Sequence, residues 1–148
     1  MIRFERTTFI AAPLAEVFAF FATHENLARI TPPAMRFRII ESPGAKLFEG
    51  ARIRYSMRIA GLPVRWTTRI TLWRENEAFA DLQERGPYRY WLHTHTFRAV
   101  PGGVSMHDQV DYDLPLGPLG RFVAGRFVKR QLEAIFDYRA EVIQKQFS

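Results

Sequence analysis

The sequence contains no cysteine among its 148 residues. It therefore has no disulfide, no thiol nucleophile and no thiolate ligand for a metal ion. A chain without cysteine fits a reducing compartment. Its first residues also lack the positively charged start and apolar stretch of a secretory leader. We therefore expect no signal peptide and a cytoplasmic protein.

Long hydrophobic runs are also missing. The longest one, Val17–Ala22, falls far short of the roughly 20 apolar residues that a membrane-spanning helix needs. There is no low-complexity tract, linker or internal repeat, and hydrophobic residues make up 47% of the chain. That fraction is enough for one substantial core. We expect a single domain over residues 1–148, with no transmembrane segment.

Acidic residues are scarce relative to basic ones, which leaves a formal net charge of +6. Many arginines alternate with apolar residues, as on the outer face of a sheet. A turn over residues 60–63, with its outer two residues paired, places Arg58 opposite Arg65. In the same register Arg54 lies opposite Arg69. Opposed like charges weaken a sheet, so this face is a candidate contact for an anionic membrane or protein surface.

A solvated face with interspersed acids is the simpler interpretation of these arginines. The sequence shows no helix-turn-helix, zinc-finger or RNA-binding aromatic signature, so nucleic acid is not predicted as a partner. It also has no P-loop, dinucleotide fingerprint or nucleophile elbow. We therefore predict no cofactor.

Periodicity and turn residues predict one strand, two short helices, a six-strand meander and a long closing helix. The first strand is expected over Ile2–Ala11, a helix opens at Pro13, and a second one spans Glu25–Ile30. The six strands are expected at Met35–Glu41, Ala51–Ile59, Val64–Trp73, Phe79–Arg85, Arg89–Val100 and Val104–Leu114.

The last third of the chain, from about Pro118 to Phe147, predicts a long amphipathic helix. Its apolar positions are Phe122, Val123, Phe127, Leu132, Ile135, Phe136, Val142 and Ile143. A long antiparallel meander curls, and such a helix can fill its concave side. A cavity between helix and sheet is where we expect function.

The most informative stretch is a hairpin closed at Pro101–Gly102. Its hydrophobic alternation sets a register in which Phe97 lies opposite Met106. His95 then lies opposite Asp108. In the same register Trp91 lies opposite Tyr112 on the concave face.

The register extends upstream through a loop at residues 86–88 and a turn at residues 75–76. It pairs Arg85 with Arg89, Gln83 with Trp91, Asp81 with His93, and Phe79 with His95, and then Ile70 with Asp81, Thr68 with Gln83, and Trp66 with Arg85. The predicted concave face then carries Tyr55, Trp66, Thr68, Asp81, Gln83, Arg85, Trp91, His93, His95, Asp108 and Tyr112. Two histidine–carboxylate couples follow from direct pairing, one between Asp81 and His93 and the other between Asp108 and His95.

These couples allow three interpretations. They can be a buried polar network that fixes strand register. They can form a pocket in which His93, His95, Gln83 and Arg85 bind polar groups of a guest held by Trp66, Trp91 and Tyr112. They can also be catalytic, with His93 or His95 as acid–base oriented by Asp81 or Asp108. His93-x-His95 is a weak metal signal, so we predict no metal. Arg139 can pair with an acid or reach the cavity.

Several segments together resemble one known family. They are Ala12-Pro13-x-x-x-Val17-Phe18-x-Phe20-Phe21, Glu25-Asn26-Leu27 with Ile30-Thr31-Pro32-Pro33, Gly86-Pro87-Tyr88 with Trp91-x-His93-x-His95-x-Phe97, and Asp108-x-Val110-x-Tyr112-x-Leu114-Pro115. With the order of elements, they resemble the START-like (SRPBCC) superfamily, in a bacterial branch described as polyketide cyclase/dehydrase-like or ligand-binding. The resemblance covers essentially the whole chain. It implies an α+β helix-grip fold, with a curved seven-stranded antiparallel sheet around a long C-terminal helix.

The resemblance also implies a deep, largely apolar cavity for lipids, sterols, quinones or polyketides. We therefore expect binding of a small, largely hydrophobic ligand with a polar or anionic group. Two alternatives stay open. One is an aromatic polyketide cyclase or dehydratase that uses His93 or His95. The other is an adaptor on anionic surfaces through Arg54, Arg58, Arg65 and Arg69.

Overall fold

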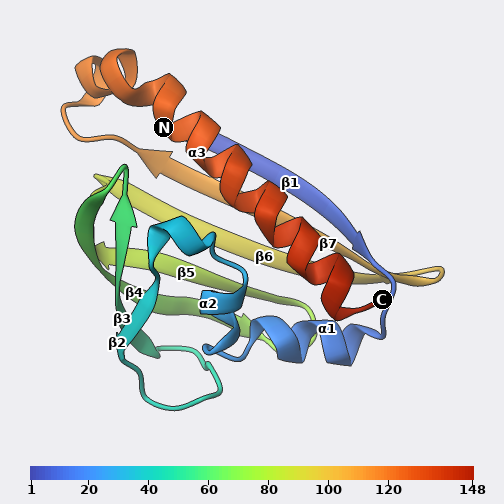
Figure 1. The fold of residues 1–148 in the computed structure, drawn as a ribbon. Coiled ribbons are helices and arrows are strands. Elements are labelled where there is room, and N and C mark those ends of the chain that lie inside the picture. The colour runs from blue at the N-terminus through green and yellow to red at the C-terminus, as the bar shows by residue number, and fades with distance from the viewer.

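A computed structural model describes residues 1–148 (Figure 1). The elements follow the predicted order, with a 3-10 turn η1 added after the second helix. They are β1 (Ile2–Ile10), α1 (Leu14–Phe21), α2 (Asn26–Arg29), η1 (Pro33–Met35), β2 (Arg38–Glu41), β3 (Arg52–Ile59), β4 (Leu62–Arg74), β5 (Ala78–Arg85), β6 (Tyr90–Val100), β7 (Gly103–Asp113) and α3 (Gly117–Gln146). Met35 belongs to η1 and not to the following strand, because Pro32 and Pro33 favour a tight turn there.

The strands form one seven-stranded antiparallel sheet in the order β1-β7-β6-β5-β4-β3-β2. The first strand thus closes against the last one, and the others follow as a meander. The long helix α3 runs diagonally over the sheet, across β7 and β6 (Figure 1). The short helices α1 and α2 lie beside the C-terminal half of α3. This is the predicted α+β helix-grip architecture.

The alternating pattern of β7 shows why the sheet has one core face. Every second residue from Val104 to Tyr112 is buried, and the residues between them are half-buried. The buried set is apolar except for Asp108, which is 2% exposed. A period of two places all these side chains under the helices. The predicted register between β6 and β7 is confirmed, including His95 opposite Asp108 and Trp91 opposite Tyr112.

The pairing of β5 with β6 is confirmed in part. Asp81 lies opposite His93 and Phe79 opposite His95, as predicted. The ladder ends at the Leu82 pair, so the predicted pairs of Gln83 with Trp91 and of Arg85 with Arg89 do not form. The loop at residues 86–88 splays the strands before those positions are reached.

The pairing of β4 with β5 has the predicted register at Ile70 and Thr68, but the turn between the strands differs from the prediction. The turn is one residue longer than predicted, because Arg74 pairs with Ala78 and Asn76 adopts a left-handed φ of 60°. A bulge between Ile70 and Leu72 absorbs the extra residue, so Ile70 still lies opposite Asp81. Thr68 lies opposite Gln83, also as predicted.

A second bulge then moves the pairing at the far end of β4. It places Thr67, and not Trp66, opposite Arg85. The predicted pair of Trp66 with Arg85 is therefore wrong. Bulges leave no clear signal in the hydrophobic alternation of a single sequence.

The predicted register between β3 and β4 is wrong. The turn consists of Ala60 and Gly61 alone, with φ angles of 51° and 78°, so Ile59 pairs with Leu62. Two left-handed residues make the tight hairpin turn that suits the twist of the strands. Alanine is uncommon in that conformation, which is why the sequence favoured a different turn. Arg58 lies opposite Pro63, so the predicted pair with Arg65 does not form.

The corrected register also changes the arginine face. Arg54 lies opposite Thr67 and donates to Glu41 at 3.1 Å, so it does not face Arg69. Arg69 lies opposite Arg52 instead. Glu84 lies between these two arginines, 2.7 Å from Arg52 Nε and 3.2 Å from Arg69 Nε. The opposed charges of this sheet face are therefore bridged by an acid.

The long helix α3 packs through one stripe only. Val128, Leu132, Phe136 and Ile143 are buried against the sheet and the first helix. Phe122, Val123 and Phe127 were predicted to share that stripe, but they are exposed, Phe122 by 89%. The first turns of α3 lie beyond the end of β1, so no sheet lies under them (Figure 1). None of the helices combines the length and hydropathy that a membrane span requires.

Candidate functional site

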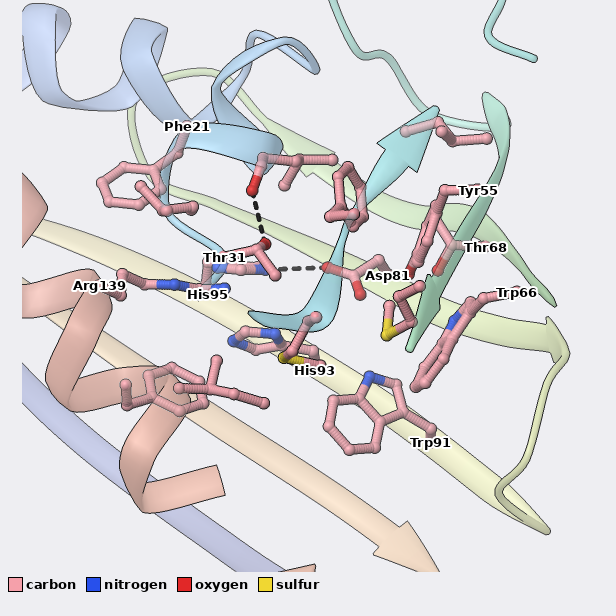
Figure 2. Close-up of a pocket in the computed structure, with 18 of the residues that line it drawn as sticks. Phe21, Thr31, Tyr55, Trp66, Thr68, Asp81, Trp91, His93, His95 and Arg139 are labelled. Carbon is pink, nitrogen blue, oxygen red and sulfur yellow. Dashed lines mark hydrogen bonds and ion pairs between the residues drawn. The ribbon is translucent and has the colours of Figure 1, made fainter. Parts of the chain in front are cut away.

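A cavity of about 140 Å³ lies between the concave face of the sheet, α3 and the segment from α1 to η1 (Figure 2). Hydrophobic residues make up 17 of the 23 residues that line it. Seven of the predicted concave-face residues are on its wall. They are Tyr55, Trp66, Thr68, Asp81, Trp91, His93 and His95.

Three other predicted ligand contacts are not on the cavity wall. The Gln83 side chain accepts from the Tyr88 N–H at 3.1 Å and donates to the Tyr88 carbonyl at 2.7 Å, so it holds the loop after β5. Arg85 is exposed and lines a shallow hollow that also includes Arg52 and Arg65. Tyr112 is 2% exposed and packs among the residues under α3.

The structure adds wall residues that sequence reasoning missed. They come from α1 to η1 and β2–β3, such as Thr31, Met35, Phe37 and Met57, and from α3, namely Leu132, Ile135 and Phe136. Arg139, for which the sequence left open an acid partner or a place at the cavity, lies on the wall and also 4.0 Å from Asp108. The spacing of the α3 residues in the sequence indicates that they share one face of the helix. Leu132, Phe136 and Arg139 recur at helical spacing, so the arginine falls in the apolar stripe. A charge at that position points to the cavity.

One end of the cavity is aromatic. The Trp66 ring lies edge-on to Trp91 with centroids 5.2 Å apart, and it stacks with Tyr55 at 6.0 Å. Trp66 is 5% exposed, and its Nε1–H is buried without a hydrogen-bond acceptor. Such rings bind flat apolar groups well, and the free N–H can donate to one acceptor on a guest.

The other end is a buried polar cluster. His93 Nε2 lies 2.8 Å from Asp108 Oδ1, and His95 Nε2 lies 2.9 Å from Asp81 Oδ2. The predicted couples are therefore crossed, although the strand pairing behind them is right. Diagonal neighbours on one face of a sheet are within reach of long side chains. The two imidazole rings lean and stack, with centroids 3.7 Å apart, and each meets the diagonal carboxylate.

Asp108 is the hub of this cluster. Its Oδ1 also lies 3.2 Å from His95 Nδ1, although that nitrogen lacks hydrogen-bond geometry. The third basic group is Arg139, whose Nη1 lies 4.0 Å from the same oxygen. Arg139 reaches in from α3 toward His95 (Figure 2). Its guanidinium lies 4.7 Å from the centroid of the Phe136 ring.

Arg139 is the least satisfied group of the cluster. Its side chain is 12% exposed, and its Nε and Nη1 are buried without any hydrogen-bond acceptor. Burial lowers the pKa of the Arg139 guanidinium, and Asp108 and Asp81 oppose that shift. An arginine keeps its charge even so. Buried donors without partners are costly, which makes this end of the cavity ready for an anionic acceptor.

The two histidines have opposite pKa shifts. Burial and the neighbouring His95 lower the pKa of His93, and its bond to Asp108 does not fully offset them. Burial would also lower the pKa of His95, but Asp108 and Asp81 raise it above its ordinary value. The same contacts outweigh burial for both carboxyl groups, whose pKa values lie below the usual range. The cluster therefore holds a proton on His95 to a higher pH than on His93.

Asp81, His93 and His95 each offer a ligand atom within 4.8 Å of the others, as a metal site would require. The Nε2 atoms of both histidines already contact carboxylates. Their rings are stacked and do not converge on one point, and Arg139 adds a positive charge nearby. The arrangement suits shared protons better than a cation.

The family model described as "Polyketide cyclase / dehydrase and lipid transport" matches residues 1–147. The chain belongs to this family. The match covers every element around the cavity, and it agrees with the resemblance to START-like proteins in the sequence. Membership indicates a ligand-binding fold and does not by itself assign an activity.

Solved structures with the same fold include the protein TTHA0849 from Thermus thermophilus. It has a TM-score of 0.78 and 15% identity, over 99% of this chain and 97% of that one. A START superfamily protein from Mycobacterium smegmatis has a TM-score of 0.73 and 15% identity, over 98% and 96% of the two chains. The major latex-like protein 151 from Panax ginseng has a TM-score of 0.73 and 13% identity, over 99% and 97%. Among curated proteins, none matches this chain.

Proposed function

We propose that this member of the family binds a small, largely hydrophobic molecule that carries an anionic group. The observation that carries the proposal is Arg139, a buried cation on the cavity wall with two donor nitrogens that lack acceptors. The rest of the wall is mostly apolar, as ligand sites usually are. The ligand classes that the fold suggests are lipids, quinones and polyketides.

The cavity suggests how such a ligand lies. Its apolar part packs against Trp66, Trp91 and Tyr55, where one acceptor can take the free N–H of Trp66. Its anionic group lies at the opposite end and accepts from Arg139. A cavity of about 140 Å³ suits a molecule with one or two rings in its buried part.

Charge balance adds a proton to the binding step. With His95 protonated, Asp81 and Asp108 are matched by His95 and Arg139. An anion then leaves one excess negative charge in a buried site. Protonation of His93 on ligand binding removes that excess, because an added negative charge raises a histidine pKa. Anion binding is therefore expected to strengthen as the pH falls, because acidification supplies the proton that His93 takes up.

Native mass spectrometry and a paired titration test the proposal. Freshly purified protein should retain a small-molecule ligand in its native mass spectrum. The emptied protein should bind 2-naphthoate at least tenfold more tightly than its methyl ester, measured by quenching of tryptophan fluorescence. Arg139→Gln should remove that preference, since hydrogen bonds to a charged group contribute about 1.5–3 kcal/mol.

Arg126→Gln is the matched control, because Arg126 is exposed on the same helix. It should leave both affinities unchanged. Equal affinity of the unaltered protein for the acid and the ester would refute an anion site. A preference for the acid that survives in Arg139→Gln would refute the role of Arg139.

A second candidate function is acid–base catalysis of the aromatic polyketide cyclase or dehydratase type. The observation that favours it is His95, held between two carboxylates on the wall of a mostly apolar cavity. A histidine oriented by an acid can move protons on a bound guest. Turnover of a poly-β-ketone substrate should then collapse in His93→Gln or His95→Gln, while binding measured by fluorescence stays within a few-fold.

The arginine face of the sheet carries less unpaired charge than its sequence suggests. Arg54 contacts Glu41, and Arg69 contacts Glu84, so acids already neutralise part of this face.

A further inference from the structure

The first turns of α3 carry an unusual number of exposed apolar side chains. Ten large hydrophobic residues of the chain are exposed, and five of them lie between residues 116 and 127. We name them the α3 tip, namely Leu116, Leu119, Phe122, Val123 and Phe127. Phe122 is 89% exposed and Leu116 75%. Scattered exposed apolar residues are ordinary, but a cluster of this kind marks an interaction surface.

The local backbone holds this tip in a fixed shape. Leu116 has a left-handed φ of 67°, which costs energy for a branched apolar residue, yet its side chain is turned to solvent. Gly120 packs so closely on the preceding turn that a Cβ at this position would collide with the Pro115 carbonyl oxygen. Apart from Gly117, the buried residues of the helix begin at Val128, about two turns after Gly120. The core therefore does not explain the tip.

Charge indicates the partner. Residues 114–132 include four basic residues and no acidic one. Three of them, Arg126, Lys129 and Arg130, are exposed, and none of the three has an ion pair with an acid. Arg126 lies within the last turn of the tip, and Lys129 and Arg130 follow it on the same helix. Exposed apolar side chains next to exposed Lys and Arg side chains are typical of a helix that lies in a membrane interface.

We propose that the α3 tip docks on anionic lipid bilayers. The apolar side chains of the tip enter the boundary between headgroups and acyl chains. Arg126, Lys129 and Arg130 then contact the lipid phosphates. The following part of the same helix, from Leu132 to Arg139, lines the cavity. Docking would therefore bring the cavity beside a source of hydrophobic molecules, although the proposal does not depend on which ligand the cavity binds.

A second copy of the chain fits this surface less well. An isologous dimer through the tip would bring the same basic residues of both copies together. The acid closest to the tip in sequence, Asp113, already lies 3.7 Å from Arg121. A bilayer with anionic lipids supplies the negative charge that a second copy lacks.

Vesicle co-sedimentation tests the docking, with phosphatidylcholine vesicles and vesicles that also contain phosphatidylglycerol. We expect several-fold tighter binding to the anionic vesicles, weakened by added salt. The pair Leu119→Ser and Phe122→Ser should reduce that binding at least tenfold. Phe48→Ser is the matched control, because Phe48 is another exposed large apolar residue but lies far from the tip in sequence, and this variant should bind normally.

The charges are tested in the same way. Arg126→Gln, Lys129→Gln and Arg130→Gln together should abolish the preference for anionic vesicles. Arg54→Gln, Arg58→Gln and Arg65→Gln remove the same charge from the sheet face and should leave it intact. Circular dichroism melting checks that every variant is folded.

Three outcomes would overturn the proposal. The first is an unaltered protein that binds neither vesicle. The second is binding that the tip variants retain, or that the sheet-face variants lose. The third is a dimer, measured by light scattering, that dissociates in Phe122→Ser while vesicle binding is absent. That last result would assign the tip to self-association.

Discussion

Asp108 is the residue on which the polar end of the cavity depends. It contacts His93, His95 and Arg139, and it is 2% exposed. Asp108→Asn would leave three buried groups around a neutral amide. Removing one partner of a buried ion pair typically costs about 3–5 kcal/mol. We expect a loss of that size in the free energy of unfolding, measured by urea titration.

Asp111→Asn is the control on the same strand, since Asp111 forms a surface pair with Arg3. It should cost about 1 kcal/mol or less. Equal losses for the two variants would mean that the buried cluster contributes nothing special to stability.

The opposite pKa shifts of the two histidines give an order of titration. NMR of the imidazole protons should show His95 losing its proton at a higher pH than His93. The raised pKa of His95 stabilises the fold fully below about pH 6.5, and this contribution disappears as pH rises through the folded value. The lowered pKa of His93 acts in reverse, with a contribution present above about pH 6.5 and lost on acidification. Titration in the reverse order would contradict the geometry of the cluster.

Among the elements, α3 is closely packed on the preceding turn at Gly120 but has open space around Gly125, so the two glycines should respond differently to substitution. Gly120→Ala would place a Cβ against the Pro115 carbonyl oxygen, so we expect a loss of about 1–3 kcal/mol, as for other overpacked sites. Gly125 has open space around its Cβ position, and Gly125→Ala should stabilise the helix by up to about 1 kcal/mol. Thermal unfolding of both variants gives the comparison. A gain in stability from Gly120→Ala would show that the tip is not rigidly built.

The elements and the concave face were predictable wherever hydrophobic alternation sets the register. The predicted β6–β7 pairing is confirmed, because a register shift of one residue would have exposed the Met106 and Val110 side chains to solvent. The β3–β4 register was wrong because nothing in the sequence marks Ala60 as left-handed. The crossed histidine couples follow from side-chain lean, which alternation does not encode. The exposed tip of α3 depends on where the sheet ends beneath the helix, and periodicity carries no information about that.

For the whole molecule, the cavity makes stability depend on its contents. A ligand that binds only the folded chain stabilises it by about 2.7 kcal/mol at a hundredfold excess over Kd. For a chain of this size that corresponds to a rise in Tm of roughly 5–10 °C. Protein stripped of bound lipid-like molecules by solvent extraction should therefore melt lower than freshly purified protein, measured by differential scanning calorimetry.

Refilling the stripped protein with the extracted fraction should restore the higher Tm, and the refilled Arg139→Gln variant should recover less of it than the unaltered chain. The tip variants Leu119→Ser and Phe122→Ser should recover fully, since their side chains lie outside the cavity wall. An equal Tm before and after extraction, with no small molecule in the extract, would mean that the cavity is stable when empty. The unpaired nitrogens of Arg139 would then need water as their acceptor, because a buried guanidinium without any partner should destabilise the fold.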